Sequence, residues 1–269
     1  MSPTNLPTKP VHGHVTFLGA GPGDPGLLTL RAVEALANAD VLVAEHDVLD
    51  VVRVHARQGV AVLNTDPDTS PVPYPGTPQL TVVDSTSTTV GDPASRDAAN
   101  LVMAAARGGK RVVRAVSGDP GLDTYAAEEM LACVAAGVPF EVVPGVAAAV
   151  GVPAYAGVPL RDAEGADVRF VDARTASNRC WTEVGASDGT VVVSTTLDSV
   201  ASAAGELVSA GRKPDTPMTV TVAGTTTRQR TWSATLGTIA QTLKQAKVLP
   251  SPEGGRPVIV VVGERSAPA

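Results

Sequence analysis

The chain has 269 residues, enough for two average domains, and 43% of them are hydrophobic. Only 3% are aromatic, so the predicted cores consist of Val, Ala and Leu, as buried parallel sheets usually do. A net charge of −6, with no cluster of Lys and Arg, argues against nucleic acid as a main partner.

Cysteine and histidine positions argue against a metal site. Cys133 and Cys180 are not spaced as metal ligands, and two cysteines are too few for a disulfide framework. His12 and His14 are assigned to a Pro/Thr-rich N-terminal tail and interpreted as surface residues. No signal peptide or long apolar span is present, which predicts a soluble cytoplasmic protein without membrane association.

The first half of the chain alternates between strand and helix patterns. An apolar strand at 15–19 enters a glycine-rich loop, and a helix is predicted over 26–38 with Asp24 as N-cap and Pro25 at its first position. A second strand at 41–45 ends in Glu45. The predicted elements that follow are helix 48–57, strand 60–63, a long irregular loop from Asn64 to Asp97, helix 97–107, strand 111–116, helix 124–136 and strand 140–143. This order predicts a parallel sheet with right-handed crossovers.

The second half repeats the alternation less regularly. Strands are predicted at 168–172, 190–194, 218–222 and 258–262, with helices near 146–153, 198–210 and 235–246. The predicted fold is two α/β/α domains, with a mainly parallel sheet in the first, a mixed sheet in the second and a ligand cleft between them. The predicted boundaries are a flexible tail at 1–13, domains at 14–144 and 145–264, and a tail at 265–269.

The glycine-rich loop differs from a dinucleotide fingerprint. Gly19, Gly21 and Gly23 alternate, Pro22 lacks an N–H group, and Asp24 adds a negative charge where phosphates would sit. This pattern disfavours an anionic diphosphate and tolerates a cationic or zwitterionic ligand. A tight strand-to-helix turn without a ligand is the alternative.

Several motifs together resemble the tetrapyrrole (corrin/porphyrin) methylase family, over nearly the whole chain from Val15 to Gly263. They are Gly-Ala-Gly-Pro-Gly-Asp-Pro-Gly-Leu-Leu-Thr (19–29), Ala-Asp-Val-Leu-Val (39–43), Gly-Asp-Pro (118–120), Glu-Glu (128–129), Gly-Val-Pro-Phe-Glu-Val-Val-Pro-Gly-Val (137–146), Pro-Ala-Tyr-Ala-Gly-Val-Pro-Leu (153–160), Gly-Thr-Thr-Thr-Arg-Gln-Arg (224–230) and Val-Val-Gly-Glu (261–264). The chain is most similar to members that methylate uroporphyrinogen III to precorrin-2, a step toward siroheme and cobalamin.

This resemblance implies a cofactor, S-adenosylmethionine, which leaves as S-adenosylhomocysteine, and a homodimer. It places cofactor contacts at Pro22, Ser117, Gly118, Asp119, Leu122, Ala147, Ala148, Thr195 and Gly224. Glycines permit close backbone approach, and Asp119 is expected to pair with the ammonium group or the ribose. A β-turn after a strand is the alternative for 118–120. Cations for substrate carboxylates are expected at Arg161, Arg228 and Arg230, and no metal is required.

Glu45 stands where the resemblance implies a catalytic carboxylate, usually aspartate. C-methylation needs a base, because a pyrrole carbon attacks the sulfonium methyl group and the resulting cation must lose a proton. A water molecule acting as the base, or a solvated residue that simply closes a strand, are the alternatives for Glu45.

Departures from the family pattern leave three hypotheses open. The 64–97 region has no Lys or His, and Ser194-Thr195-Thr196 stands where the family has Tyr-Met-Gly. The first hypothesis is an active tetrapyrrole C-methyltransferase for uroporphyrinogen III or another precorrin. The second is a degenerate module that acts as scaffold or regulator, resembling the N-terminal part of a fusion with uroporphyrinogen-III synthase. The third is a methylase for a different class of substrate.

Overall fold

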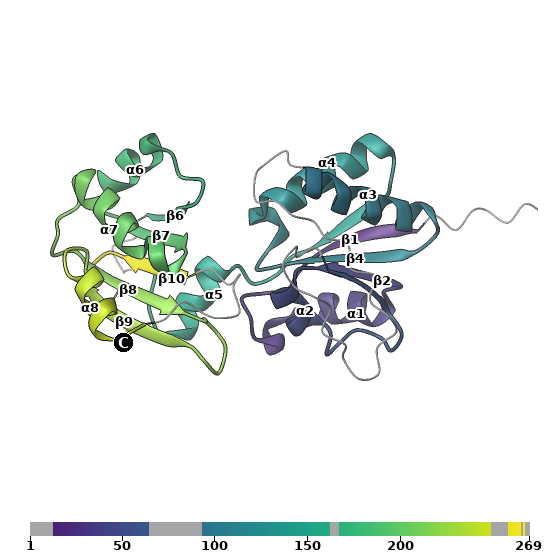
Figure 1. Cartoon of the computed structure of the whole chain (residues 1–269), viewed down its shortest axis with the longest axis horizontal. Helices are drawn as coiled ribbons and strands as arrows, with labels where there is room; N and C mark the ends of the chain where they lie inside the picture. The colour runs from purple at the N-terminus through teal and green to yellow at the C-terminus, as the bar shows by residue number, and fades with distance from the viewer. Residues whose placement is uncertain (1–12, 65–92, 162–166, 249–257, 265, 267–269) are drawn as a thin grey trace, which may run out of the picture. The chain divides into compact units, whose positions relative to one another are not determined.

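Two β-sheets of short, valine-rich strands form the cores of two separate units in the computed structural model (Figure 1). The structure describes residues 13–64, 93–161, 167–248, 258–264 and 266. The first unit comprises Met1–Gly21 and Pro25–Val146, and the second comprises Pro22–Asp24 and Ala147–Ala269.

The described strands of the first unit form one five-stranded sheet in the order β3-β2-β4-β1-β5, with every pairing parallel. These strands are β1 (His14–Gly19), β2 (Val41–Ala44), β3 (Ala61–Asn64), β4 (Arg111–Val116) and β5 (Phe140–Val143). Its α-helices are α1 (Leu30–Asn38), α2 (His46–Val52), α3 (Pro93–Arg107) and α4 (Thr124–Ala136). Figure 1 shows α1 and α2 on one face of the sheet and α3 and α4 on the other. Because both faces are covered, neighbouring positions such as Phe17 and Leu18 are both fully buried, in different clusters.

The second unit has a mixed sheet in the order β6-β7-β10-β8-β9. Its strands are β6 (Val168–Asp172), β7 (Thr190–Thr195), β8 (Pro217–Val222), β9 (Arg230–Thr235) and β10 (Val258–Val262). Only the β6–β7 pair among these is parallel. The α-helices α6 (Asn178–Gly185), α7 (Val200–Ser209) and α8 (Ile239–Gln245) pack on one face, and α5 (Ala148–Tyr155) packs on the other. The prediction of a parallel sheet followed by a mixed sheet is confirmed.

The start of the first helix was predicted wrongly. Pro25–Leu27 forms a single 3₁₀ turn (η1), and the α-helix begins at Leu30. Its N-cap is Thr29, whose hydroxyl accepts a hydrogen bond from the Ala32 N–H at 3.2 Å. Leu30 is 91% exposed, so the helix faces the core through Ala32 and Leu36 instead. Asp24 has a different role, because its contacts place it in the second unit.

Other boundaries also differ from the prediction. His14 is the first residue of β1 and not part of the tail, and α3 begins at Pro93, within the predicted loop. The rest of that loop, 65–92, lies outside the described residues. Helix α6 and strand β9 were not predicted, and the last helix was predicted to begin near 235 although Thr235 still belongs to β9. Strand β9 pairs with β8 and opposes Trp232 to Val220, and this tertiary pairing, more than local propensity, fixes a strand there.

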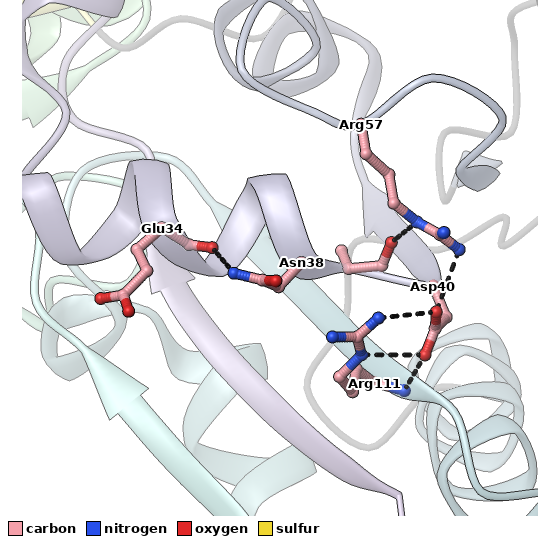
Figure 2. Close-up of polar contacts among 6 residues, drawn as sticks. Glu34, Asn38, Asp40, Arg57 and Arg111 are labelled. Carbon is pink, nitrogen blue, oxygen red and sulfur yellow. Dashed lines mark hydrogen bonds and ion pairs between the residues drawn. The ribbon is translucent and has the colours of Figure 1, made fainter.

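A polar cluster holds the amino ends of β2 and β4 together (Figure 2). The Asp40 carboxylate accepts hydrogen bonds from the Arg111 N–H at 2.9 Å and from the Arg111 Nε at 3.1 Å. Arg57 lies 2.9 Å from the other carboxylate oxygen. The side-chain hydrogen bond from Arg111, followed by the backbone hydrogen bond from the same residue, holds the pKa of Asp40 well below its usual range.

Asp40→Asn is expected to lower the free energy of unfolding by about 1 kcal/mol at pH 7. A depressed carboxyl pKa stabilises the fold above the unfolded-state value of about 4, and this contribution is lost as the pH falls below it. The difference between the denaturant midpoints of the two proteins should therefore stay constant from pH 7 to pH ~5 and narrow as the pH falls from about 4 toward about 3, since the contribution is lost fully only below the folded-state pKa. Asp50→Asn is the control, because Asp50 lies at an exposed position, 3.4 Å from Arg53. A difference at Asp40 that does not change with pH would contradict the assignment.

Candidate functional site

The predicted site residues divide into two groups, one in each unit. In the first unit, β2, β4 and β1 are neighbours in a parallel sheet, so the loops that follow them lie at the same edge. Glu45 follows β2, Ser117–Asp119 follow β4, and Gly21 follows β1. The structure thus brings Glu45 and the 117–119 segment to one edge of the first sheet.

Closely packed glycine backbones connect the loops at this edge. Gly21 and Gly118 form an isolated β-bridge, with N–H to O distances of 3.2 and 2.9 Å. Both have positive φ, 73° and 67°. A Cβ atom on Gly145 would lie 2.2 Å from the Gly118 carbonyl oxygen, so no side chain fits there. The loops after β1, β4 and β5 therefore form one rigid backbone cluster.

Asp119 is bonded within this cluster through both carboxylate oxygens. One accepts the Gly121 N–H at 2.8 Å, and the other accepts the Gly145 N–H at 2.8 Å. Its carboxylate therefore holds two loops together in addition to any role toward a ligand. The sequence analysis did not identify Gly145 as its partner, although the Pro144-Gly145 turn signal marks the position. Leu122, at the end of the adjacent 3₁₀ turn (η2, Pro120–Leu122), is 69% exposed.

Glu45 is exposed and occupies the N-cap position of α2, but its side chain does not cap that helix. A buried ion pair lies nearby on β4 and α4. The Arg114 Nε donates to both oxygens of Glu129 at 3.1 and 3.0 Å, and both residues are less than 5% exposed. Burial lowers the pKa of Arg114, but the charges of Glu129, Glu45 and Asp123 outweigh burial and raise it. Arg114 is thus a buried cation whose field reaches Glu45.

Sequence reasoning did not identify Arg114 as part of the site. The available signal was an arginine in the middle of the otherwise apolar run Val112-Val-Arg-Ala-Val116. A charged residue at such a position needs a buried partner, and the register places Arg114 beside Val43, two residues before Glu45.

The second group lies in the second unit. Thr195 ends β7, and Gly224 follows β8. Since β7 and β8 both run antiparallel to the intervening β10, their ends lie at the same edge of the sheet. Ala147 is the N-cap residue of α5, and Ala148 is its first residue. Pro22 also belongs to this unit.

Two positions in this group, both predicted as cofactor contacts, have unusual surroundings. The Thr195 hydroxyl is buried and has no hydrogen-bond partner in the part of the chain that the structure describes. Such an atom is costly unless a water or ligand pairs with it. At Gly224 a Cβ atom would lie 2.5 Å from both γ-carbons of Val152, so only glycine fits there without a shift. The Thr195 hydroxyl is thus available to a ligand, whereas the need for glycine at 224 comes from packing against Val152 of α5.

The three predicted substrate-binding arginines, Arg161, Arg228 and Arg230, are all exposed. Arg230 opens β9, and its guanidinium donates to the Gln229 carbonyl at 3.0 Å. Arg228 lies in the loop between β8 and β9. These cations are accessible to an anionic molecule at the surface of the second unit.

Searches for metal and membrane features gave negative results for the described residues. No group of three or more His, Cys, Asp or Glu side chains in those residues has the geometry to hold a metal ion. None of the described helices has the length and apolar character needed to span a bilayer.

Comparison with known proteins agrees with the motifs. The family model of the tetrapyrrole (corrin/porphyrin) methylases matches residues 14–240. The siroheme synthase of Stutzerimonas stutzeri is 34% identical over 256 residues, which cover 94% of this chain and 50% of that protein. Siroheme synthase 1 of Klebsiella pneumoniae is 34% identical over 260 residues, 94% of this chain and 49% of that protein. The chain spans about half the length of the curated relatives it matches.

Solved structures share the fold. Uroporphyrin-III C-methyltransferase from Thermus thermophilus, solved with S-adenosyl homocysteine, superposes with a TM-score of 0.68. It is 27% identical, and the match covers 94% of this chain and 98% of that one. A cobalt precorrin-4 methyltransferase superposes with a TM-score of 0.73 over 98% of this chain and 100% of its own, and at 22% identity it supports the fold alone. From the family match over 14–240 and from these relatives, the chain belongs to the tetrapyrrole (corrin/porphyrin) methylases.

Proposed function

We propose that the chain is an S-adenosylmethionine-dependent C-methyltransferase that acts on a tetrapyrrole, with uroporphyrinogen III as substrate and precorrin-2 as product. The observation that carries the proposal is the match over 94% of the chain to a methyltransferase solved with S-adenosyl homocysteine. The buried Thr195 hydroxyl, which has no hydrogen-bond partner among the described residues, supports it because it offers a hydrogen bond at a predicted cofactor position.

We assign a role in the methyl transfer to each group from its chemistry. Bound S-adenosylmethionine supplies an electrophilic sulfonium methyl group. The residues predicted as cofactor contacts are assigned the task of orienting the cofactor, because orientation contributes most to a methyl transfer between aligned atoms. Glu45 accepts the proton that the cation formed by methylation loses. The charge of the buried Arg114 interacts with that of Glu45.

Substrate charge is matched by the exposed arginines of the second unit. Uroporphyrinogen III carries eight carboxylates, so a cationic surface raises both its affinity and its association rate. We assign this role to Arg161, Arg228 and Arg230, which are exposed.

Calorimetric titration with S-adenosylhomocysteine tests the proposal before any unstable substrate is needed. Micromolar affinity, about −8 kcal/mol, is expected, followed by methylation of uroporphyrinogen III. Binding without turnover on this substrate would direct the search to other precorrins. No detectable binding would overturn the proposal and favour a degenerate methylase module that acts as scaffold or regulator.

Asp119→Ala is expected to weaken S-adenosylhomocysteine binding by about 10-fold or more, because the Gly121 and Gly145 N–H groups lose their shared acceptor. Asp123→Ala is the matched control, since Asp123 caps α4 through the Ala126 N–H at 2.7 Å. This variant should lose about 1 kcal/mol of stability and keep its affinity. Equal affinity losses in both variants, measured by calorimetry, would show that Asp119 acts only through general stability.

A further inference from the structure

Asp24 joins three segments of the second unit that are far apart in the sequence. Its carboxylate accepts a hydrogen bond from the Tyr155 hydroxyl at 2.9 Å, across 131 positions. Its backbone N–H donates to the Thr225 hydroxyl at 3.2 Å, across 201 positions. The segment Pro22–Asp24 is therefore held at both α5 and the loop that follows β8.

The loop after β8 has an unusual backbone. Ala223 and Thr225 have positive φ values of 50° and 63°, a region that residues with a Cβ atom rarely adopt. Side chains within the loop hold this conformation: the Gln229 side-chain oxygen accepts the Thr225 N–H at 2.7 Å, and the Thr226 hydroxyl donates to the Ala223 carbonyl at 2.7 Å. Backbone strain of this kind persists only where the surroundings fix it, and it is concentrated at binding sites.

Helix α5 contains one partner of Asp24, Tyr155, and packs against the residue that precedes the other partner, Thr225. Val152 packs directly against Gly224, and Tyr155 lies one helical turn further along α5. Thr225 is 3% exposed. Two predicted cofactor contacts are thus linked to the same helix: Pro22 through Asp24, two residues further along the chain, and Gly224 through its own contact with Val152.

We propose that Asp24 is a positioning residue that fixes Pro22 relative to the Ala223–Thr225 loop, so that two distant segments form one cofactor-binding surface on the second unit. This proposal rests on the proposed function, because it assigns a role to Asp24 in binding the same cofactor. It replaces the helix-cap role that the sequence predicted for this residue.

Because the Tyr155 side chain is partly exposed, the role of Asp24 can be tested separately from folding. Tyr155 is 53% exposed, so its hydrogen bond to Asp24 competes with water and contributes little to overall stability. The hydrogen bond to Asp24, and secondarily the charge of Asp24, raise the pKa of Tyr155. Ionisation of Tyr155 therefore reports on the contact directly.

The experiment uses the full chain and S-adenosylhomocysteine as the probe. Asp24→Ala should weaken binding by about 10-fold or more, and Tyr155→Phe and Thr225→Val by about 3- to 10-fold each. Asp24→Asn keeps an acceptor for the Tyr155 hydroxyl, so its affinity should lie within about 3-fold of the unsubstituted protein. Asp215→Ala, at an exposed position before β8, is the control and should bind normally.

A spectrophotometric titration of phenolate supplies the second readout. Subtracting the curve of Tyr155→Phe isolates Tyr155 from the other two tyrosines. Its pKa should fall back toward the ordinary value of about 10 in Asp24→Ala. Unchanged affinity in Asp24→Ala would overturn the proposal, and so would a Tyr155 pKa that is the same with and without Asp24. No S-adenosylhomocysteine binding by the unsubstituted protein would instead overturn the proposed function and the binding role of Asp24 with it.

Discussion

Glu45→Gln is expected to lower turnover of uroporphyrinogen III by about 100-fold or more, the usual contribution of a positioned general base. Glutamine has nearly the same size as glutamate but does not accept a proton at neutral pH. Because Glu45 is exposed and its side chain does not cap α2, the substitution should leave folding intact. Steady-state rates with uroporphyrinogen III, compared with calorimetric affinity for S-adenosylhomocysteine, should show a loss in turnover alone.

The control for Glu45 is Glu45→Asp, which keeps the carboxylate and shortens the side chain by one methylene. This variant should recover a substantial part of the lost rate. Full turnover by Glu45→Gln would show that water or another group removes the proton. A loss of cofactor affinity in Glu45→Gln would show that Glu45 acts in binding.

Glu129→Gln is expected to lower the stability of the first unit by about 3–5 kcal/mol, the usual cost of removing one partner of a buried ion pair. The substitution leaves the Arg114 guanidinium buried without its charged partner. Circular dichroism in denaturant should show the first unit unfolding earlier. Both tryptophans, Trp181 and Trp232, lie in the second unit, so their fluorescence serves as an internal reference that is expected to change little.

Two further variants make the Glu129 experiment specific. Glu128→Gln changes the same functional group one position away on α4 and should have a small effect, because Glu128 is not part of the buried pair. Replacing Arg114 and Glu129 together by Met should cost much less than Glu129→Gln alone, since no unpaired charge remains. A small effect of Glu129→Gln, with the double variant costing as much or more, would contradict the buried-charge explanation.

Much of the fold is predictable from local pattern in this chain. The apolar runs at 111–116 and 258–262 are strands with the predicted bounds, and the helix at 124–136 ends at Gly137 as predicted, with φ of 65°. Each of these elements has a strong local signal in the sequence. For the strands it is a mostly apolar run, as in a sheet covered on both faces, and for the helix it is a glycine, which the left-handed C-cap conformation favours. Strand β9 has no such signal, because it depends on pairing with β8.

For the candidate site, the sequence pattern located residues at strand ends but not their hydrogen-bond partners. The order of strands and turns, together with the family motifs, placed Glu45 and Asp119 after the ends of neighbouring parallel strands. The sequence therefore determined which residues lie at the sheet edges. It did not reveal that Asp119 holds Gly145 or that Arg114 is paired with Glu129.

The clearest contrast concerns Asp24. Its local context, Asp followed by Pro, predicts a helix cap. The glycine-rich turn around Asp24 could also be predicted from the local sequence alone. Only the tertiary structure decided its partners, because Tyr155 and Thr225 lie 131 and 201 positions away. Hydrogen bonds over such separations depend on how whole elements pack, and neighbouring residues in the sequence carry no signal of that packing.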